Sequence, residues 1–538
     1  MKNKVINEKK NGNIIINSFI TIVLAFIIYF FFLPALNISS IGFWIYVVII
    51  IGIFTLLSLI NNLDSKGRLI GNVKLVSAGG MIIMFIFAAI MIVNFILSPL
   101  FSSKKYSERI SVNEEGDFLK DIELVDFSKL PLLDKDSSQK LGDRVMGQMP
   151  ELVSQFYVSN LYTQINYNDE IIRVTPLEYN GFFKYLANYK DGIKGYITVN
   201  SVNGESKLTK IDKGMKYMPS AILMQNLNRK LRFSYPTKIF GEKSFELDNE
   251  GNPYWIVPTI KYAGVELRKE IEGVIILDPI TGDSKFYDVK DVPTWVDHVY
   301  SASLIIEQLD NWGQYKDGFL NSMFGQKNVT MTTDGYNYLV MNDDVYLYTG
   351  ITSVASDESN LGFVLTNMRT KETNFYPVPG AEEYSAMASA EGQVQQMDYT
   401  ASFPLLINLN GKATYLMSLK DNAGLVKMYA FVDVADYQKV VVTDAASGIE
   451  NAAQKYLGES AIEVDEDALT TKEITVSNVA TATINGYTYY YITDTDNKKY
   501  MVSISVNKEL LPFVAKDSKV TISYQNTDSD VINLTKIK

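Results

Sequence analysis

The chain has 538 residues, a formal net charge of −11, no cysteine and one histidine, His298. Without cysteine there is no disulfide framework, thiolate metal site or cysteine nucleophile, and a Ser-His-Asp triad would depend on a single histidine. Residues 1–101 carry a net charge of +5 and residues 102–538 carry −16. An acidic surface of that size argues against nucleic-acid binding, which needs clustered Lys and Arg.

Three apolar runs without a charged residue open the chain: Ile14 to Ala35, Ile41 to Ile60, and Leu75 to Phe101. Each has at least 20 residues, and about 20 helical residues cross the hydrocarbon core of a bilayer. We therefore expect a three-helix transmembrane anchor over residues 1–101, in contact with lipid through residues 14–101. The first run is too long for a signal peptide and no cleavage site follows it, so an uncleaved anchor is expected.

Basic residues predict the orientation of these helices. The first 13 residues hold four lysines, the 61–74 loop holds three basic residues, and the 36–40 connection holds none. The positive-inside rule then places the N-terminus in the cytoplasm and residues 102–538 outside a bacterial plasma membrane. The runs contain no ionisable residue, which favours an anchor over a transporter. Asn17, Thr21 and Asn94 are modest polar candidates for a transport role.

After the anchor, a strand, a proline-marked helix and a hairpin recur in the same order over residues 102–442. Units begin near residues 122, 195, 273 and 362, with a partial copy at 426. In the later units a proline is expected to open the helix, at Pro219, Pro293 and Pro379. Gly turns are expected to close the hairpins, at Asn249 to Gly251, Asp334-Gly335 and Asn410-Gly411. A repeat of this kind predicts a tandem α+β architecture.

One unit carries a family resemblance. Its order is a helix, a hairpin with a Gly turn, an aromatic second strand, and a strand that ends in Asp-Pro-x-Thr-Gly. The matching residues are Phe245, Glu246, Gly251, Tyr254, Trp255, Gly273, Val274, Asp278, Thr281 and Gly282. This pattern resembles the PepSY module over about residues 115–442. The resemblance implies extracytoplasmic helix-plus-antiparallel-sheet modules that bind or regulate; residues 258–272 have no place in the compact module.

Residues 443–470 are expected to form a helix and an acidic linker, Glu463 to Asp467, without the spacing of a calcium loop. Five strand-like segments follow over residues 471–538, with Asn485-Gly486 as a hairpin turn and a short helix after the third segment. This order resembles the OB-fold, a five-stranded β-barrel. Tyr487, Tyr489 and Tyr491 share one face of a strand, which is expected to line the barrel core rather than a base-stacking platform.

No catalytic motif emerges. His298 is expected to be a partly exposed helical histidine beside Asp297, and pairs such as Asp343-Asp344 and Glu382-Glu383 rarely converge on one site. We predict no catalytic, metal or cofactor residues. The predicted function is a non-catalytic, membrane-anchored scaffold of the bacterial cell envelope that binds envelope or membrane proteins, with self-association open. The alternatives are an extracytoplasmic enzyme on envelope polymers and an accessory subunit of a transport or secretion complex.

Overall fold

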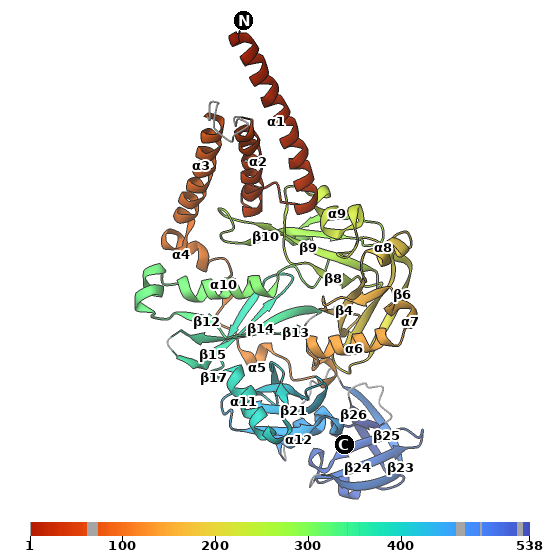
Figure 1. Ribbon diagram of the computed structural model, residues 1–538. Coiled ribbons are helices and arrows are strands. Elements are labelled where there is room, and N and C mark those ends of the chain that lie inside the picture. The colour runs from red at the N-terminus through yellow and green to blue at the C-terminus, as the bar shows by residue number, and fades with distance from the viewer. Residues whose placement is uncertain are drawn as a thin grey trace.

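The computed structural model describes residues 2–61, 74–341, 343–354, 356–458, 469–484, 487–524 and 531–538. Three helices stand together at one end of the molecule: α1 (Lys2–Phe32), α2 (Ile41–Ile60) and α3 (Lys74–Leu97) (Figure 1). Among the described residues, Ile14–Phe32, Ile41–Ile60 and Val76–Leu97 are long and apolar enough to cross a membrane.

The first and third apolar helices are shorter than the runs expected from the sequence, because a proline follows each of them. Leu33 has a positive φ of 51° and precedes Pro34. Pro99 opens a separate short helix, α4 (Pro99–Ser107). Because the residue before a proline disfavours the helical conformation, both runs end before their last apolar residue.

Four antiparallel sheets follow, and all four have the same strand plan. Each sheet has five strands in chain order. The first two strands both pair with the long third strand. The third strand also pairs with the fourth, and the fourth pairs with the fifth. The first sheet contains β2 (Phe156–Val158), β3 (Thr163–Tyr167), β4 (Glu170–Tyr179), β5 (Ile193–Asn200) and β6 (Ser206–Met215). The second contains β7 (Ile239–Phe240), β8 (Ser244–Leu247), β9 (Pro253–Lys261), β10 (Glu270–Leu277) and β11 (Ser284–Asp288).

The third and fourth sheets repeat this plan. The third contains β12 (Thr330–Thr332), β13 (Asn337–Met341), β14 (Asp344–Ser353), β15 (Ser356–Asn367) and β16 (Thr373–Tyr376), with β1 (Val112–Asn113) and β17 (Gly380–Ala381) added at its edges. The fourth contains β18 (Thr400–Ala401), β19 (Leu405–Leu409), β20 (Lys412–Lys420), β21 (Val426–Asp433) and β22 (Val440–Asp444). The fourfold recurrence of one topology is the main architectural feature of the chain.

A helix precedes each sheet. These helices are α6 (Lys135–Gly147) with α7 (Pro150–Val153), then α9 (Leu227–Ser234), α10 (Ala302–Tyr315) and α11 (Glu383–Gln393); α5 (Phe118–Asp121), α8 (Phe182–Asn188) and α12 (Ile449–Leu457) lie outside this pattern. The structural unit is therefore a helix followed by five strands. The units expected from Gly195, Gly273 and Gly362 begin inside the fourth strand of a sheet. Each unit expected from the sequence therefore combines the last strands of one sheet with the helix and first strands of the next sheet.

The expected helix starts at Pro219 and Pro293 are wrong. α9 begins after Asn226, whose side chain accepts a hydrogen bond from Arg229 N at 3.1 Å, and α10 begins after Ser301, which caps Leu304 N. Asn and Ser at the N-cap satisfy free helix N–H groups, which a proline cannot do. Residues 293–301 are consequently not helical, and this segment carries His298.

One of the expected hairpins is also wrong. β12 and β13, on either side of Asp334-Gly335, both pair with β14 and not with each other. The turns at Asn249 to Gly251 and at Asn410-Gly411 do join paired strands. Asn410 and Gly411 have φ of 51° and 71°, as a tight hairpin turn requires.

The hydrophobic cores are shared between neighbouring units. One cluster joins the first and second sheets, through residues such as Ile197, Phe245 and Leu277. A second joins the other face of the second sheet to α10 and the third sheet, and a third joins the third and fourth sheets around α11. Because each inner sheet contributes to two clusters, the four units form a continuous stack.

The C-terminal sheet lies at the end opposite α1–α3 (Figure 1). It contains β23 (Thr470–Ile484), β24 (Tyr487–Asp494), β25 (Lys499–Ser503), β26 (Lys519–Tyr524), β27 (Val531–Asn533) and β28 (Lys536–Ile537). β23, β24 and β25 form a meander, and β26 pairs with β23. β27 pairs with β25 and β28 pairs with β26, so two consecutive parts of the last segment lie at the two ends of the sheet.

The tyrosine row in β24 faces the other way from the expected direction. Tyr490 and Ile492 pack against the core cluster of this sheet, so Tyr489 and Tyr491 lie on the opposite face. Tyr491 therefore does not line this core, whereas Tyr489 is 7% exposed and is buried outside the core cluster. A 3₁₀ turn, Leu511–Phe513, stands where a short helix was expected. The acidic stretch 463–467 and the Asn485-Gly486 turn lie outside the described residues.

Candidate functional site

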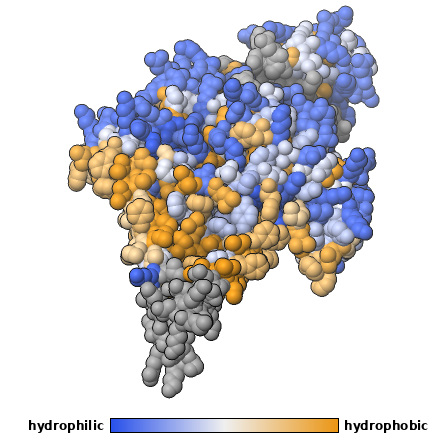
Figure 2. All heavy atoms as spheres, turned by 90° about the horizontal axis from the view of Figure 1, so that it is seen from above, coloured by the Kyte–Doolittle hydropathy of each residue, from blue (hydrophilic) through white to orange (hydrophobic). Residues whose placement is uncertain are grey.

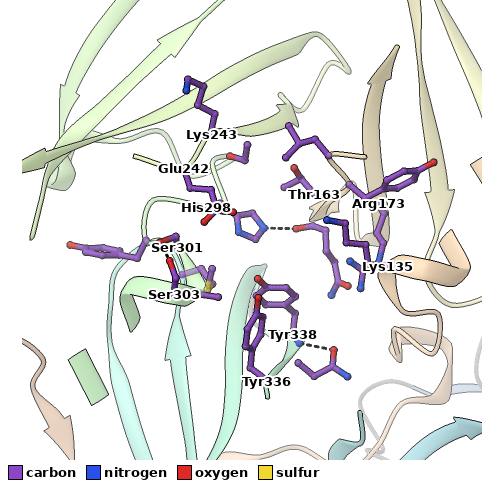
Figure 3. Close-up of a pocket in the computed structure, with 18 of the residues that line it drawn as sticks. Lys135, Thr163, Arg173, Glu242, Lys243, His298, Ser301, Ser303, Tyr336 and Tyr338 are labelled. Carbon is purple, nitrogen blue, oxygen red and sulfur yellow. Dashed lines mark hydrogen bonds between the residues drawn. The ribbon is translucent and has the colours of Figure 1, made fainter. Parts of the chain in front are cut away.

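A cavity of about 520 Å³ lies where the first three sheets and the start of the fourth meet. β3 and β4 form one wall, the link from β7 to β8 another, and residues 298–303 with β13 the remainder. Figure 3 shows Arg173, Lys135 and Lys243 around the same space as His298 and Tyr338. The cavity is built from residues far apart in the sequence, which only the stacking of the units brings together.

His298 lies in this cavity rather than on a helix. Its Nε2 donates a hydrogen bond to the Gln164 carbonyl oxygen at 2.6 Å, which fixes the proton on that nitrogen because a carbonyl can only accept (Figure 3). Its ring meets Tyr338 edge-on at a centroid distance of 5.8 Å. The histidine is partly exposed, as expected, but the expectation that it is helical is wrong. The hydrogen bond to Gln164 and the contact with Tyr338 hold the imidazole ring of His298 in position, and neither of them involves a nucleophilic side chain close to activation by the ring.

Arg173 is the most unusual residue of the cavity. It is 5% exposed and makes no hydrogen bond or ion pair with any described residue. Burial lowers the pKa of its guanidinium to about 10, so the group stays charged at neutral pH. Gln164 beside it is 1% exposed, and neither polar atom of its side-chain amide has a partner among the described residues. Buried polar groups are normally paired, so this wall needs an explanation.

Two buried carboxyl groups stand behind the cavity wall. Asp297 N donates to Glu246 Oε2 at 2.8 Å, and Asn166 N donates to Asp297 Oδ2 at 2.9 Å. Ser244 Oγ donates to the other Glu246 oxygen at 2.5 Å. Burial first, and the neighbouring Glu246 second, raise the pKa of Asp297 well above its ordinary value. These bonds join β8, β3 and the 293–301 segment, and so hold His298 in place.

A second set of polar contacts fixes the sheets to the apolar helices. Arg229 Nε donates to the Phe30 carbonyl at 3.2 Å, and Arg232 Nε donates to the Leu33 carbonyl at 3.0 Å. Both arginines thus satisfy carbonyl groups at the end of α1, where a helix leaves its last carbonyls unpaired. The first sheet, the second sheet and α9 are held against α1 in a defined position.

The loop between β9 and β10, in the 258–272 region that had no place in the expected module, reaches α2 and α3. Glu266 Oε1 accepts from Ile41 N at 3.1 Å at the start of α2. Asn94 in α3 exchanges two hydrogen bonds of 3.0 Å with the Val265 backbone. Asn94 therefore binds the loop. Asn17 instead accepts from Asn61 at 2.8 Å, and Thr21 is buried in α1, so the three polar candidates for transport are not brought together.

One residue of each adjacent carboxylate pair has structural partners. Asp344 accepts from the Arg369 guanidinium at 2.6 Å, and Glu383 is buried against Tyr348 and Asn360. In the described part of the chain, no group of three or more His, Asp or Glu side chains could hold a metal ion. Arg173 and Gln164 were not identified from the sequence. A signal was present in the sequence, because Arg173 is the one charged residue in the mostly apolar stretch from Ile171 to Leu177.

No protein-family model matches the chain, and no curated protein matches it. Among solved structures, one match is the α-L-arabinofuranosidase from Lactobacillus brevis, at 8% identity and a TM-score of 0.15. This match covers 69% of the present chain and 94% of the other. A TM-score of this size carries no argument about fold or activity.

Proposed function

We propose that this chain is a non-catalytic binding and scaffold protein of the bacterial cell envelope, anchored in the plasma membrane by α1–α3. The observation that carries this proposal is the stacking of four like sheets on shared cores, with the second unit held against the ends of three apolar helices. A rigid stack presents surfaces in fixed relative positions, which suits a scaffold. The basic residues around α1 and in the 61–74 loop support an orientation with residues 102–538 outside the cell.

Two finer parts of the proposal rest on topology. A helix, a hairpin and two further strands in every unit support the PepSY-like interpretation of residues 115–442. The pairing of the last segment with both β25 and β26 supports an OB-like barrel for residues 471–538. The PepSY-like and OB-like resemblances both favour a binding role over catalysis. A resemblance in fold does not establish function, so the function must be argued from the residues of a particular site.

The edge strands are the surfaces best suited to a protein partner. β6 has ten residues and stands at the end of its sheet, with one side unpaired in the described part of the structure. An extended peptide can add to such an edge through backbone hydrogen bonds. Lys207, Lys210 and Lys213 are exposed along it, and lysines on an edge strand discourage pairing with unselected chains.

The test is site-specific crosslinking of the full chain in intact cells. A photo-reactive amino acid at Lys210, on the edge of β6, should capture the same envelope protein in repeated experiments. The control position is Glu151 on α7, which is also exposed but lies on no strand edge. The proposal fails if Lys210 captures no protein and a general lysine crosslinker captures none either.

A further inference from the structure

Arg173 differs from the other buried arginines in the described structure. Arg109 donates to Glu270, to Glu307 and to the Lys269 carbonyl at 3.2, 2.6 and 2.6 Å. Arg232 donates to four backbone carbonyls. Arg173 is buried to the same degree and has no such partner. A charge removed from water without compensation costs several kcal/mol, so a protein that keeps one there has a use for it.

No carboxylate of the cavity forms an ion pair with Arg173. Lys135 and Lys243 also line the space; Lys135 is exposed, and burial and then Arg232 lower the pKa of Lys243. The carboxylates there are Asp134 and Glu242. Asp134 already forms an ion pair with Lys420 and accepts from Ser137 N, and Glu242 is exposed to solvent. Asp134 acts on Arg173 only through its charge, without a hydrogen bond or ion pair, so the guanidinium has no direct counter-ion among the described residues of the cavity.

We propose that this cavity binds a small organic molecule carrying a carboxylate or phosphate group, which the Arg173 guanidinium holds. A planar guanidinium presents paired N–H groups that match two oxygens of such an anion. This inference goes beyond the protein contacts proposed above and does not depend on them.

The volume and the other walls define the size of the ligand. A space of about 520 Å³ lies in the range of small-molecule sites and is too small for a folded partner. Tyr336, Tyr338 and Phe403 also line the cavity, so an aromatic or apolar part of the ligand would lie against rings. His298, held by its bond to Gln164, leaves Nδ1 free to accept a hydrogen bond.

The experiment uses the full-length protein in detergent and measures thermal unfolding and calorimetric binding. The probes are phenyl phosphate, benzoate and inorganic phosphate, and benzamide is the neutral control. At least one anionic probe should raise the unfolding temperature in a saturable way, and benzamide should not. Arg173→Gln should weaken that binding by roughly tenfold or more, because hydrogen bonds to a charged group contribute more than neutral ones.

Matched variants separate a binding role from a structural one. Arg144→Gln removes an exposed arginine from α6 and should leave binding unchanged. Without ligand, Arg173→Gln should unfold at the same or a higher temperature than the wild type, because it removes an unpaired buried charge. If Arg173→Gln does not fold, Arg173→Lys replaces it; it keeps the charge, loses the paired N–H groups of the guanidinium and should also weaken binding. The proposal is overturned if no anionic probe binds, or if the folded Arg173 variant binds as the wild type does.

Discussion

At the scale of single residues, the buried carboxyl groups of Asp297 and Glu246 hold the 293–301 segment in place, where the sequence pattern predicts a helix. That pattern predicts Asp297 as a helical neighbour of His298. In the structure its backbone N–H and one side-chain oxygen are both used, on β8 and β3 respectively. Apolar spacing through Val296, Val299 and Leu304 looked helical because these residues are buried, although only the last of them is in α10. Burial and helical periodicity coincided there by chance.

Asp297→Asn should change how stability depends on pH. The folded pKa of Asp297 is raised, whereas an unfolded Asp titrates near 4. The folded state therefore binds the proton more tightly, and stability falls as pH rises from about 4 to the folded pKa. Asparagine keeps an acceptor for Asn166 N without the charge. The variant should show a flatter pH profile and, at pH 7, be more stable by about 1–3 kcal/mol, measured by denaturant unfolding.

The control for this prediction is Asp212→Asn, at an exposed carboxyl group on β6. That variant should keep the pH profile of the wild type. Equal slopes for Asp297→Asn and the wild type between pH 4 and 7 would show that Asp297 ionises without cost and would contradict the assigned pKa direction.

At the scale of elements, local signals predicted strands and turns better than helix ends. The Asn410-Gly411 turn is local chemistry, and it predicted its hairpin correctly. The Asp334-Gly335 turn carries an equally strong local signal, yet its flanking strands pair with β14 instead. Strand choice depends on which long strand is available nearby, and that information lies outside a short window. The cavity could not be predicted for the same reason, since its walls come from four units.

Helix α8 carries an exposed apolar surface beside the end of α1. Phe182 is 54% exposed and Phe183 is 79% exposed. Tyr185 of α8 donates to the Ile222 carbonyl at 3.0 Å, while Arg229 donates to both Leu223 and Phe30 carbonyls. The surface is thus linked through hydrogen bonds to the end of an apolar helix. Figure 2 shows that apolar side chains gather on the face of the molecule seen from above.

We expect Phe183 to contact the lipid interface when the protein is in a membrane. Exposed aromatic residues on a short helix are well suited to the boundary between headgroups and acyl chains. The chain has no cysteine, so Phe183→Cys gives a single site for an environment-sensitive fluorophore. In vesicles, spin-labelled lipids should quench this label. A label at Tyr437→Cys, exposed on the fourth sheet far from α1–α3, should not be quenched. Equal accessibility to quenching at both positions would contradict the expectation.

At the scale of the whole molecule, the sequence predicted a recurrence but not where each unit begins. A repeated order of strand, helix and hairpin reads equally well from any of its elements. Only the pairing of β2 to β6 with one another, and likewise in the later sheets, shows that a unit begins at its helix. The contacts of α6 and α11 with the sheets that follow them add a second reason. The same long-range contacts make the four units one body, mounted on the ends of α1–α3.

The orientation of that body is the property on which the proposed function most depends, and single cysteines can test it. Lys213→Cys lies on β6, and Lys66→Cys lies in the 61–74 loop. If basic residues keep the loop in the cytoplasm, a membrane-impermeant maleimide should label Lys213→Cys in intact cells. It should label Lys66→Cys only after the membrane is permeabilised. Labelling of both after permeabilisation controls for reactivity. If Lys66→Cys were labelled in intact cells and Lys213→Cys were not, the sheets would lie in the cytoplasm and an extracytoplasmic scaffold would be ruled out. The proposal of a ligand in the cavity around Arg173 does not depend on this result, because it holds in either compartment.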